Sequence, residues 1–346
     1  MTQYTQELKE TALALIASGK GILAIDESSG TCNKRFEALG IPTTEERRQA
    51  YRELILCTPG LADHVSGLIL FDETIRQSTK SGIPFTKVMQ DAGMLIGIKV
   101  DTGANDLAGG FGEKVTEGLD GLRSRIADYY KMGARFAKWR AVITIGDQIP
   151  SQNCIEANAH ALARYAALCQ EGGLVPIVEP EILLDGAHSI ERCYDVTDQA
   201  LQAVFTQLKL NRVALDQIIL KPSMVISGID CPIGASANQV ADFTVQCLRN
   251  NVPSSVPGVA FLSGGQTNEQ ATLNLQLINA NYGTQCPWTI TFSYGRAIQQ
   301  PALDAWAGND DAVGVAQQIL FDRVKLNGAA SKGEYNLEME KKLVAA

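Results

Sequence analysis

Eight short apolar segments recur along the chain, separated from one another by polar turns and amphipathic stretches. They end at residues 26, 71, 99, 138, 179, 221, 263 and 293, and most of these ends lie about 40 residues apart. Short apolar runs of this kind are typical of strands buried on both faces of a parallel sheet. Eight alternating strand and helix units therefore predict an α/β fold, a closed parallel (β/α)8 or TIM barrel rather than an open sheet.

The expected elements follow from the same periodicity. We expect strands over 21–26, 66–71, 94–100, 135–142, 174–179, 218–221, 259–263 and 288–293. We expect helices over 6–18, 45–57, 114–132, 154–170, 189–210, 235–249 and 268–279. A glycine-rich loop covers 103–112 and a polar turn covers 27–31. With 346 residues and no internal linker, the chain is predicted to form one barrel domain over 1–326 and a flexible C-terminal tail over 327–346.

Composition limits the classes of partner. The net charge of −8 argues against a nucleic-acid partner, since phosphate backbones require a basic surface. No apolar run has membrane-spanning length and no targeting segment is seen, so a location in the cytoplasm, or in the plastid stroma as a mature chain, is expected. The eight cysteines form no Cys-x-x-Cys pair and the three histidines lie far apart. We therefore expect reduced thiols, no metal and no cofactor, although a regulatory disulfide remains an alternative.

The segment Asp-Gln-Ile-Ile-Leu-Lys-Pro-Ser at 216–223 draws attention to one lysine. Three large apolar residues lead directly into Lys221, and Pro222 then removes a backbone donor. Lys221 should therefore lie at the carboxyl end of a buried strand, where desolvation lowers the pKa of an amine and makes it nucleophilic. The alternative is a lysine that extends its charged end to solvent.

The other strand ends favour a catalytic lysine. In a (β/α)8 barrel the carboxyl ends of all strands meet at one mouth. Ionisable side chains gather at these ends here, namely Asp26, Lys99, Lys138, Glu179, Lys221 and Arg296. A barrel built for stability alone has no need of this set, so we interpret Lys221 as a Schiff-base nucleophile.

Roles for the neighbouring groups follow from their chemistry. A nearby Lys138 disfavours a second positive charge on Lys221. Glu179 can act as the general acid that expels water from a carbinolamine, and Glu181 can tune it. Asp26 can take a proton from a substrate hydroxyl, which breaks a carbon–carbon bond when a protonated imine accepts the electrons. Ion pairing of the two glutamates with Lys138 and Arg140 is the structural alternative.

Two anion sites are predicted around this lysine. Ser263, Gly264 and Gly265 can present backbone N–H groups to a phosphate, and Arg296 can clamp it. Ser28, Thr31, Arg35 and Lys99 form a candidate second site across the mouth. Two anion sites beside one imine-forming lysine indicate a bisphosphorylated ketose.

Seven motifs resemble one known family. They are 21–35, Gly-Ile-Lys-Val-Asp at 97–101, Phe-Ala-Lys-Trp-Arg at 136–140, Val-Glu-Pro-Glu at 178–181, Leu-Lys-Pro at 220–222, Phe-Leu-Ser-Gly-Gly-Gln at 261–266 and Phe-Ser-Tyr-Gly-Arg at 292–296. Together they resemble class I fructose-1,6-bisphosphate aldolase, over residues 6–335.

The resemblance implies a division of roles. Lys221 would be the Schiff-base lysine and Glu179 the main acid/base, with Asp26, Lys138 and Glu181 assisting. The C1 phosphate would bind Ser263, Gly264, Gly265, Ser293 and Arg296, and the C6 phosphate Arg35, Ser28, Thr31 and Lys99.

The resemblance also implies a metal-free, cofactor-free homotetramer acting on sugar phosphates in glycolysis, gluconeogenesis or the Calvin cycle. Many members end in a catalytic tyrosine, whereas the last tyrosine here is Tyr335. We therefore expect Glu179 or a substrate phosphate to replace it.

Three alternatives remain at this stage. Another Schiff-base aldolase or transaldolase would use a different sugar phosphate, with sedoheptulose 1,7-bisphosphate a plausible second substrate. A scaffold protein would not need the charges at the mouth. A metal-dependent lyase is disfavoured by the scarcity of histidine.

Overall fold

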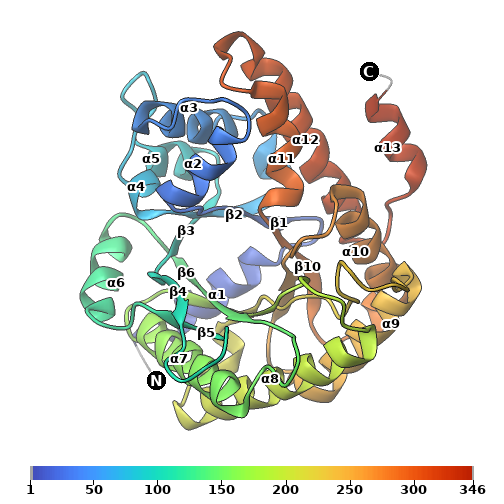
Figure 1. Ribbon diagram of the computed structural model, residues 1–346. Coiled ribbons are helices and arrows are strands. Elements are labelled where there is room, and N and C mark those ends of the chain that lie inside the picture. The colour runs from blue at the N-terminus through green and yellow to red at the C-terminus, as the bar shows by residue number, and fades with distance from the viewer. Residues whose placement is uncertain (1–2, 345–346) are drawn as a thin grey trace.

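A closed eight-stranded barrel forms the centre of the molecule (Figure 1). The structure is a computed structural model that describes residues 3–344, with side chains described for residues 3–341. The barrel strands are β1 (Gly21–Ile25), β2 (Val65–Leu70), β3 (Leu95–Lys99), β6 (Phe136–Ile143), β7 (Val175–Ile182), β8 (Ile219–Leu220), β9 (Gly258–Phe261) and β10 (Thr289–Tyr294). They pair in parallel in the order β1-β10-β9-β8-β7-β6-β3-β2, which confirms the predicted (β/α)8 architecture.

Helices surround this barrel (Figure 1). The helices are α1 (Thr5–Leu15), α2 (Ser29–Glu37), α3 (Glu45–Leu56), α4 (Asp72–Ile75), α5 (Phe85–Asp91), α6 (Leu122–Lys131), α7 (Gln152–Glu171), α8 (Ile190–Leu210), α9 (Ala237–Asn251), α10 (Asn268–Tyr282), α11 (Arg296–Trp306), α12 (Val313–Ala330) and α13 (Leu337–Val344). Short 3-10 turns lie at Leu61–Asp63, Leu215–Gln217, Gly283–Gln285 and Asp310–Ala312.

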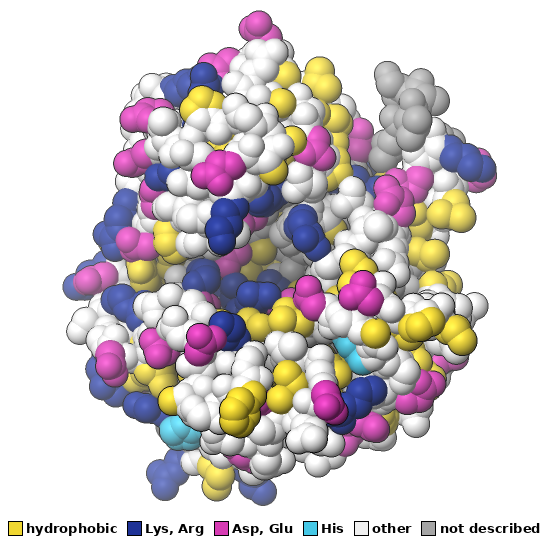
Figure 2. Space-filling view, viewed as in Figure 1, with side chains coloured by type: hydrophobic (Ala, Val, Ile, Leu, Met, Phe, Trp, Pro, Cys, Tyr) yellow, Lys and Arg dark blue, Asp and Glu magenta, His cyan; other side chains and the backbone are white. Residues whose placement is uncertain are grey.

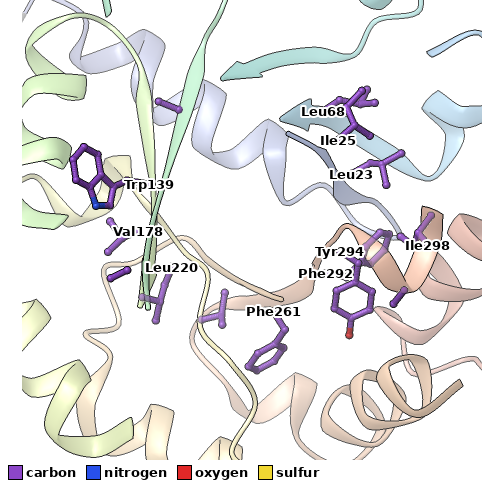
Figure 3. Close-up of a cluster of buried hydrophobic side chains, with 14 of the residues drawn as sticks. Leu23, Ile25, Leu68, Trp139, Val178, Leu220, Phe261, Phe292, Tyr294 and Ile298 are labelled. Atoms are coloured by element: carbon purple, nitrogen blue, oxygen red, sulfur yellow. The ribbon is translucent and has the colours of Figure 1, made fainter. Parts of the chain in front are cut away.

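Two apolar clusters hold the layers together. One lies between the strands and the outer helices and includes Leu23, Trp139 and Leu220 (Figure 3). The other fills the barrel interior, where Ile22, Phe136 and the other inward-facing strand residues pack against α1. Helix α1 therefore packs against the barrel interior through an apolar face, whereas the ionisable strand ends lie at the carboxyl edge of the sheet.

One glycine is required inside the barrel. A Cβ atom at Gly97 on β3 would lie 2.2 Å from the Phe136 ring, so no larger residue fits there without a shift. This close approach brings β3 and β6 together, and these strands carry Lys99 and Lys138 at their ends.

The helix predicted over 114–132 was wrong in its first half. Residues Gly103–Asp106 (β4) and Lys114–Glu117 (β5) form an antiparallel hairpin, and α6 begins only at Leu122. The β-branched Thr116 in β5 bonds the Arg140 carbonyl, and Gly118 and Gly121 have positive φ angles that break the helix. The polar turn expected over 27–31 becomes the start of α2, capped by the Ser28 hydroxyl.

The predicted tail does not begin at a structural boundary. Asn327 is buried inside α12, which continues to Ala330, and α13 follows. Residues 345 and 346 of the tail lie outside the described residues. That the tail moves stays a prediction.

Candidate active site

Strand alternation points the predicted catalytic side chains inward. Ile219 faces the barrel interior and Leu220 faces the helices, so Lys221 faces inward again. The same alternation turns Glu179 and Glu181 inward on β7, beyond the interior residue Ile177. Side chains from separate strands therefore meet at one end of the barrel.

Lys221 is buried beside Glu179. Only 3% of Lys221 is exposed, and its Nζ lies 3.2 Å from Glu179 Oε1. Lys221 directly follows the two-residue strand β8, and its backbone N–H donates to the Val178 carbonyl at 2.8 Å. The side chain is therefore held inside the barrel, and the alternative of a lysine extended to solvent is wrong.

Lys138 joins two buried carboxylates. Its Nζ lies 2.6 Å from Asp26 Oδ2 and 3.4 Å from Glu179 Oε2. A continuous row, Asp26–Lys138–Glu179–Lys221, thus crosses the mouth and draws on β1, β6, β7 and β8. Within the described part of the chain, Glu179 Oε2 is buried and accepts no hydrogen bond, so the 3.4 Å approach of Lys138 Nζ is its only polar contact among those residues.

The charges in this row stabilise one another. Burial alone would raise the pKa of Asp26, but attraction to Lys138 and Lys221 outweighs burial and holds that pKa below its ordinary value. Burial opposes the charge on Lys138, yet Asp26 and Glu179 raise the pKa of Lys138 well above its ordinary value. At neutral pH the site therefore contains an aspartate and a lysine cation.

Glu181 is engaged by an arginine. Arg140 Nε makes a close ion pair with Glu181 Oε2, and Glu181 is 7% exposed. Burial disfavours the Arg140 cation, but attraction to Glu181 raises the pKa of Arg140 above its ordinary value. The ion pair between Glu181 and Arg140 that the sequence suggested as an alternative is thus present. It orients the side chain of Glu181, which lies two residues after Glu179 on β7.

The glycine turn and Arg296 lie together as predicted. Gly264 and Gly265 have φ angles of 45° and 90°, which favour glycine. A Cβ atom at Gly265 would lie 3.7 Å from Arg296 Nη2, so the guanidinium adjoins the turn. The Ser293 hydroxyl is buried and has no hydrogen-bond partner among the described residues. Ser293 lies on β10, which pairs with β9, and the glycine turn follows β9, so the unpaired hydroxyl, the turn and the arginine come from neighbouring strand ends and fit an anion.

A cavity of about 880 Å³ contains most of the second predicted set. Its lining includes Ser28, Thr31 and Lys99 together with Asp26 and Lys138, and Figure 2 shows the hollow with Lys and Arg side chains gathered in it. Lys221 and the glycine turn are not among the lining residues, but Glu179 and Lys138 connect Lys221 to it.

Arg35 does not line this cavity. It makes an ion pair of 2.6 Å with Glu27 and donates to Gln300 at 3.1 Å. Glu27 and Asp101 were not predicted as partners of Arg35 and Lys99, although Asp101 lies in the Gly-Ile-Lys-Val-Asp motif. Arg76 and Arg125 in the cavity wall were not predicted either, since they come from the segments after β2 and β5 and carry no sequence signal.

Comparisons with known proteins agree with this geometry. The family model for class-I fructose-bisphosphate aldolase matches residues 7–346. The chain belongs to this family. It is thus an aldolase, a carbon–carbon lyase, and the resemblance seen in its motifs is confirmed.

Similar members come from bacteria, plants and a parasite. A probable class 1 fructose-bisphosphate aldolase of Xanthomonas campestris pv. campestris is 58% identical, with 95% of this chain and 98% of that protein covered. Fructose-bisphosphate aldolase 5, cytosolic, of Arabidopsis thaliana is 50% identical, with 96% and 92% covered. A crystal structure of the Plasmodium falciparum aldolase, in a ternary complex with TRAP and a small-molecule inhibitor, has a TM-score of 0.95, 45% identity and 97% of each chain covered.

Two features are absent from residues 3–344. No helix there is both long and apolar enough to cross a bilayer. No group of three or more His, Cys, Asp or Glu side chains in that range is arranged to hold a metal ion.

Proposed function

We propose that this chain cleaves fructose 1,6-bisphosphate reversibly to dihydroxyacetone phosphate and glyceraldehyde 3-phosphate, through a Schiff base on Lys221. The observation that carries the proposal is the buried row Asp26–Lys138–Glu179–Lys221. In this row the Lys221 amine contacts the Glu179 carboxyl group. The Asp26 carboxylate lies on the other side of Lys138, which contacts both acids. Imine formation and aldol cleavage require these groups.

The first half of the reaction forms the imine. The Lys221 amine attacks the C2 carbonyl carbon and gives a carbinolamine. Glu179, 3.2 Å from Lys221 Nζ, takes the proton that Lys221 gives up when it becomes the attacking amine, and it returns this proton to the carbinolamine hydroxyl, which leaves as water. The product is a protonated imine, whose positive charge replaces that of an ammonium beside Glu179. Glu181, held by Arg140, maintains the negative charge of this region.

The second half breaks the carbon–carbon bond. Asp26 accepts the C4 hydroxyl proton, the C3–C4 electrons move toward the imine, and glyceraldehyde 3-phosphate leaves. Glu179 or a substrate phosphate then returns a proton to C3 of the enamine, and water releases dihydroxyacetone phosphate from Lys221. The depressed pKa of Asp26 keeps it ionised and able to accept the proton.

The phosphates would bind on opposite sides of this row. We assign the C1 phosphate to Ser263, Gly264, Gly265, Ser293 and Arg296, because Arg296 adjoins the glycine turn and the buried Ser293 hydroxyl has no partner among the described residues. We assign the C6 phosphate to Ser28, Thr31, Lys99 and Arg35, and Arg35 would have to exchange Glu27 for the phosphate. The same two sites could hold sedoheptulose 1,7-bisphosphate, since the cavity leaves room for a longer chain.

The proposal is tested by trapping the imine. Borohydride added with fructose 1,6-bisphosphate should leave a covalent adduct on Lys221, located by mass spectrometry of the digested protein. Lys221→Ala should lose at least about a thousandfold in kcat, whereas Lys209→Ala, which removes an exposed lysine on α8, should keep full activity.

Full activity in Lys221→Ala would contradict the Schiff-base mechanism. A panel of kcat/KM values for fructose and sedoheptulose bisphosphates and for monophosphates distinguishes the substrate alternatives.

The names of the relatives support a proposal on location, and the family resemblance supports one on assembly. Arabidopsis relatives bear the names cytosolic and chloroplastic, and we infer one of these compartments for this chain. We also infer a homotetramer, which light scattering on the purified protein would test.

A further inference from the structure

Asp101 is a buried carboxylate in the cavity wall to which the proposed mechanism gives no role. It follows strand β3, and its side chain is 3% exposed. Lys99, at the end of the same strand, donates from Nζ to the Asp101 carbonyl at 2.8 Å and makes a close ion pair with Asp101 Oδ1. The second oxygen, Oδ2, accepts from the backbone N–H of Arg140 at 3.2 Å. Both carboxylate oxygens are therefore bonded, and one of them neutralises a proposed phosphate ligand.

This arrangement has two opposite effects on an anion at Lys99. The two bonds to Asp101 hold the ammonium at the cavity wall, which reduces the entropy lost when an anion binds. The carboxylate charge, however, lies within contact distance of that ammonium, so it repels any phosphate that shares the cation. In a partly desolvated cavity this repulsion is weakly screened.

We propose that Asp101 is a positioning residue that sets the affinity of the C6-phosphate site by fixing Lys99 and opposing the bound phosphate. The inference rests on the proposed assignment of Lys99 to that phosphate. The carboxylate keeps the second phosphate from being held too strongly, which favours release of the phosphorylated aldehyde. A residue with this role changes substrate and transition-state binding equally, because the phosphate remains in place through bond cleavage.

The substitution Asp101→Asn tests the role of the charge. The single amide oxygen can still accept from the backbone N–H of Arg140, and the backbone carbonyl of residue 101 still accepts from Lys99, so the ammonium keeps one of its two bonds. We expect the KM for fructose 1,6-bisphosphate to fall about fivefold with kcat unchanged. An unreactive hexitol 1,6-bisphosphate should inhibit more tightly by the same factor, and the KM for fructose 1-phosphate should not change.

Two further variants test whether Asp101 acts on the phosphate through Lys99. In a Lys99→Met background, Asp101→Asn should have no effect on the bisphosphate KM, since the double-mutant cycle removes the shared cation. Asp128→Asn is the matched control, because Asp128 lines the same cavity but pairs with Lys131 at 3.7 Å and is 62% exposed. It should leave both KM values unchanged.

Equal changes for both substrates, a higher bisphosphate KM, or the same effect without Lys99 would each overturn the inference. If Asp101→Asn does not fold, Asp101→Ser, which keeps an oxygen acceptor for the Arg140 N–H, takes its place with the same expectations. Failure of the Schiff base is a separate outcome, visible as the absence of a Lys221 adduct in the wild-type chain.

Discussion

At the scale of single residues, Lys138 determines the charge state of the site. It is 4% exposed and is the cation common to Asp26 and Glu179. Removing one partner of a buried ionic cluster leaves the others uncompensated, and this is costly. Lys138 should therefore affect both the chemistry and the pH range in which the site works.

We predict that Lys138→Met lowers kcat by about a hundredfold or more and shifts the acid limb of the pH–rate profile to higher pH. The shift is upward because Lys138 lowers the pKa of Asp26, so its loss lets that pKa rise. Steady-state rates from pH 4 to 9 measure both effects. Lys131→Met, which removes an exposed lysine on α6, is the control and should change neither.

The depressed pKa of Asp26 also makes the stability of the fold depend on pH. Because the folded-state pKa of Asp26 is depressed, its ionisation stabilises the fold above its unfolded pKa of about 3.9, and this contribution is lost as the pH falls through the folded-state pKa. The stability difference between the wild type and Lys138→Met should thus narrow in acid. A difference that stays constant down to pH 2 would contradict this account.

At the scale of secondary structure, α13 is held on the barrel by one buried arginine. Arg323 on α12 is 5% exposed and bonds both carboxylate oxygens of Glu340 at 2.7 Å. Tyr335 is buried beside them, and its hydroxyl donates to Glu340 Oε1 at 3.0 Å. These contacts dock the helix as a unit, so a single side chain should control its release.

We predict that Glu340→Gln increases amide exchange and tryptic cleavage over residues 331–344, with little change in global stability. Arg323 keeps its bonds to the Asn268 carbonyl and the Thr272 hydroxyl, so the barrel itself stays intact. Glu338→Gln on the same helix removes only an exposed pair with Lys341 and should have no effect. Equal protection in both variants would show that Glu340 does not hold α13.

The contrast between strands and this helix shows what a sequence can predict. The eight strands were found because a strand buried on both faces has an apolar run that is visible locally. The docking of α13 depends on Arg323 and Glu340, which no local pattern pairs. The hairpin of β4 and β5 was missed for a similar reason, since Thr116 is held by the distant Arg140 carbonyl. In the active site, Lys138, Glu179 and Lys221 were predicted from their positions at strand ends. The pairing of Lys99 with Asp101 and of Arg35 with Glu27 is visible only in the structure.

At the scale of the whole molecule, stability and chemistry occupy opposite ends of the barrel. Helix α1 packs Leu8 and Leu15, both fully buried, into the apolar barrel interior. The charged row and the cavity lie at the carboxyl ends of the strands, as in barrels generally. A change at the α1 end should therefore lower stability without altering catalysis.

We predict that Leu8→Ala lowers the free energy of unfolding by about 3 kcal/mol while kcat and KM at 25 °C stay unchanged. The loss has two parts, the transfer energy of the removed methyl groups and the cavity left between α1 and the inward-facing strand residues. Leu13 lies on the same helix but is 61% exposed, so Leu13→Ala changes helix propensity in the same way without creating a cavity and should cost far less. Denaturant unfolding measures both variants. A lowered kcat in Leu8→Ala under fully folded conditions would show that packing at the α1 end affects the row Asp26–Lys138–Glu179–Lys221. The separation of stability and chemistry between the two ends would then be wrong.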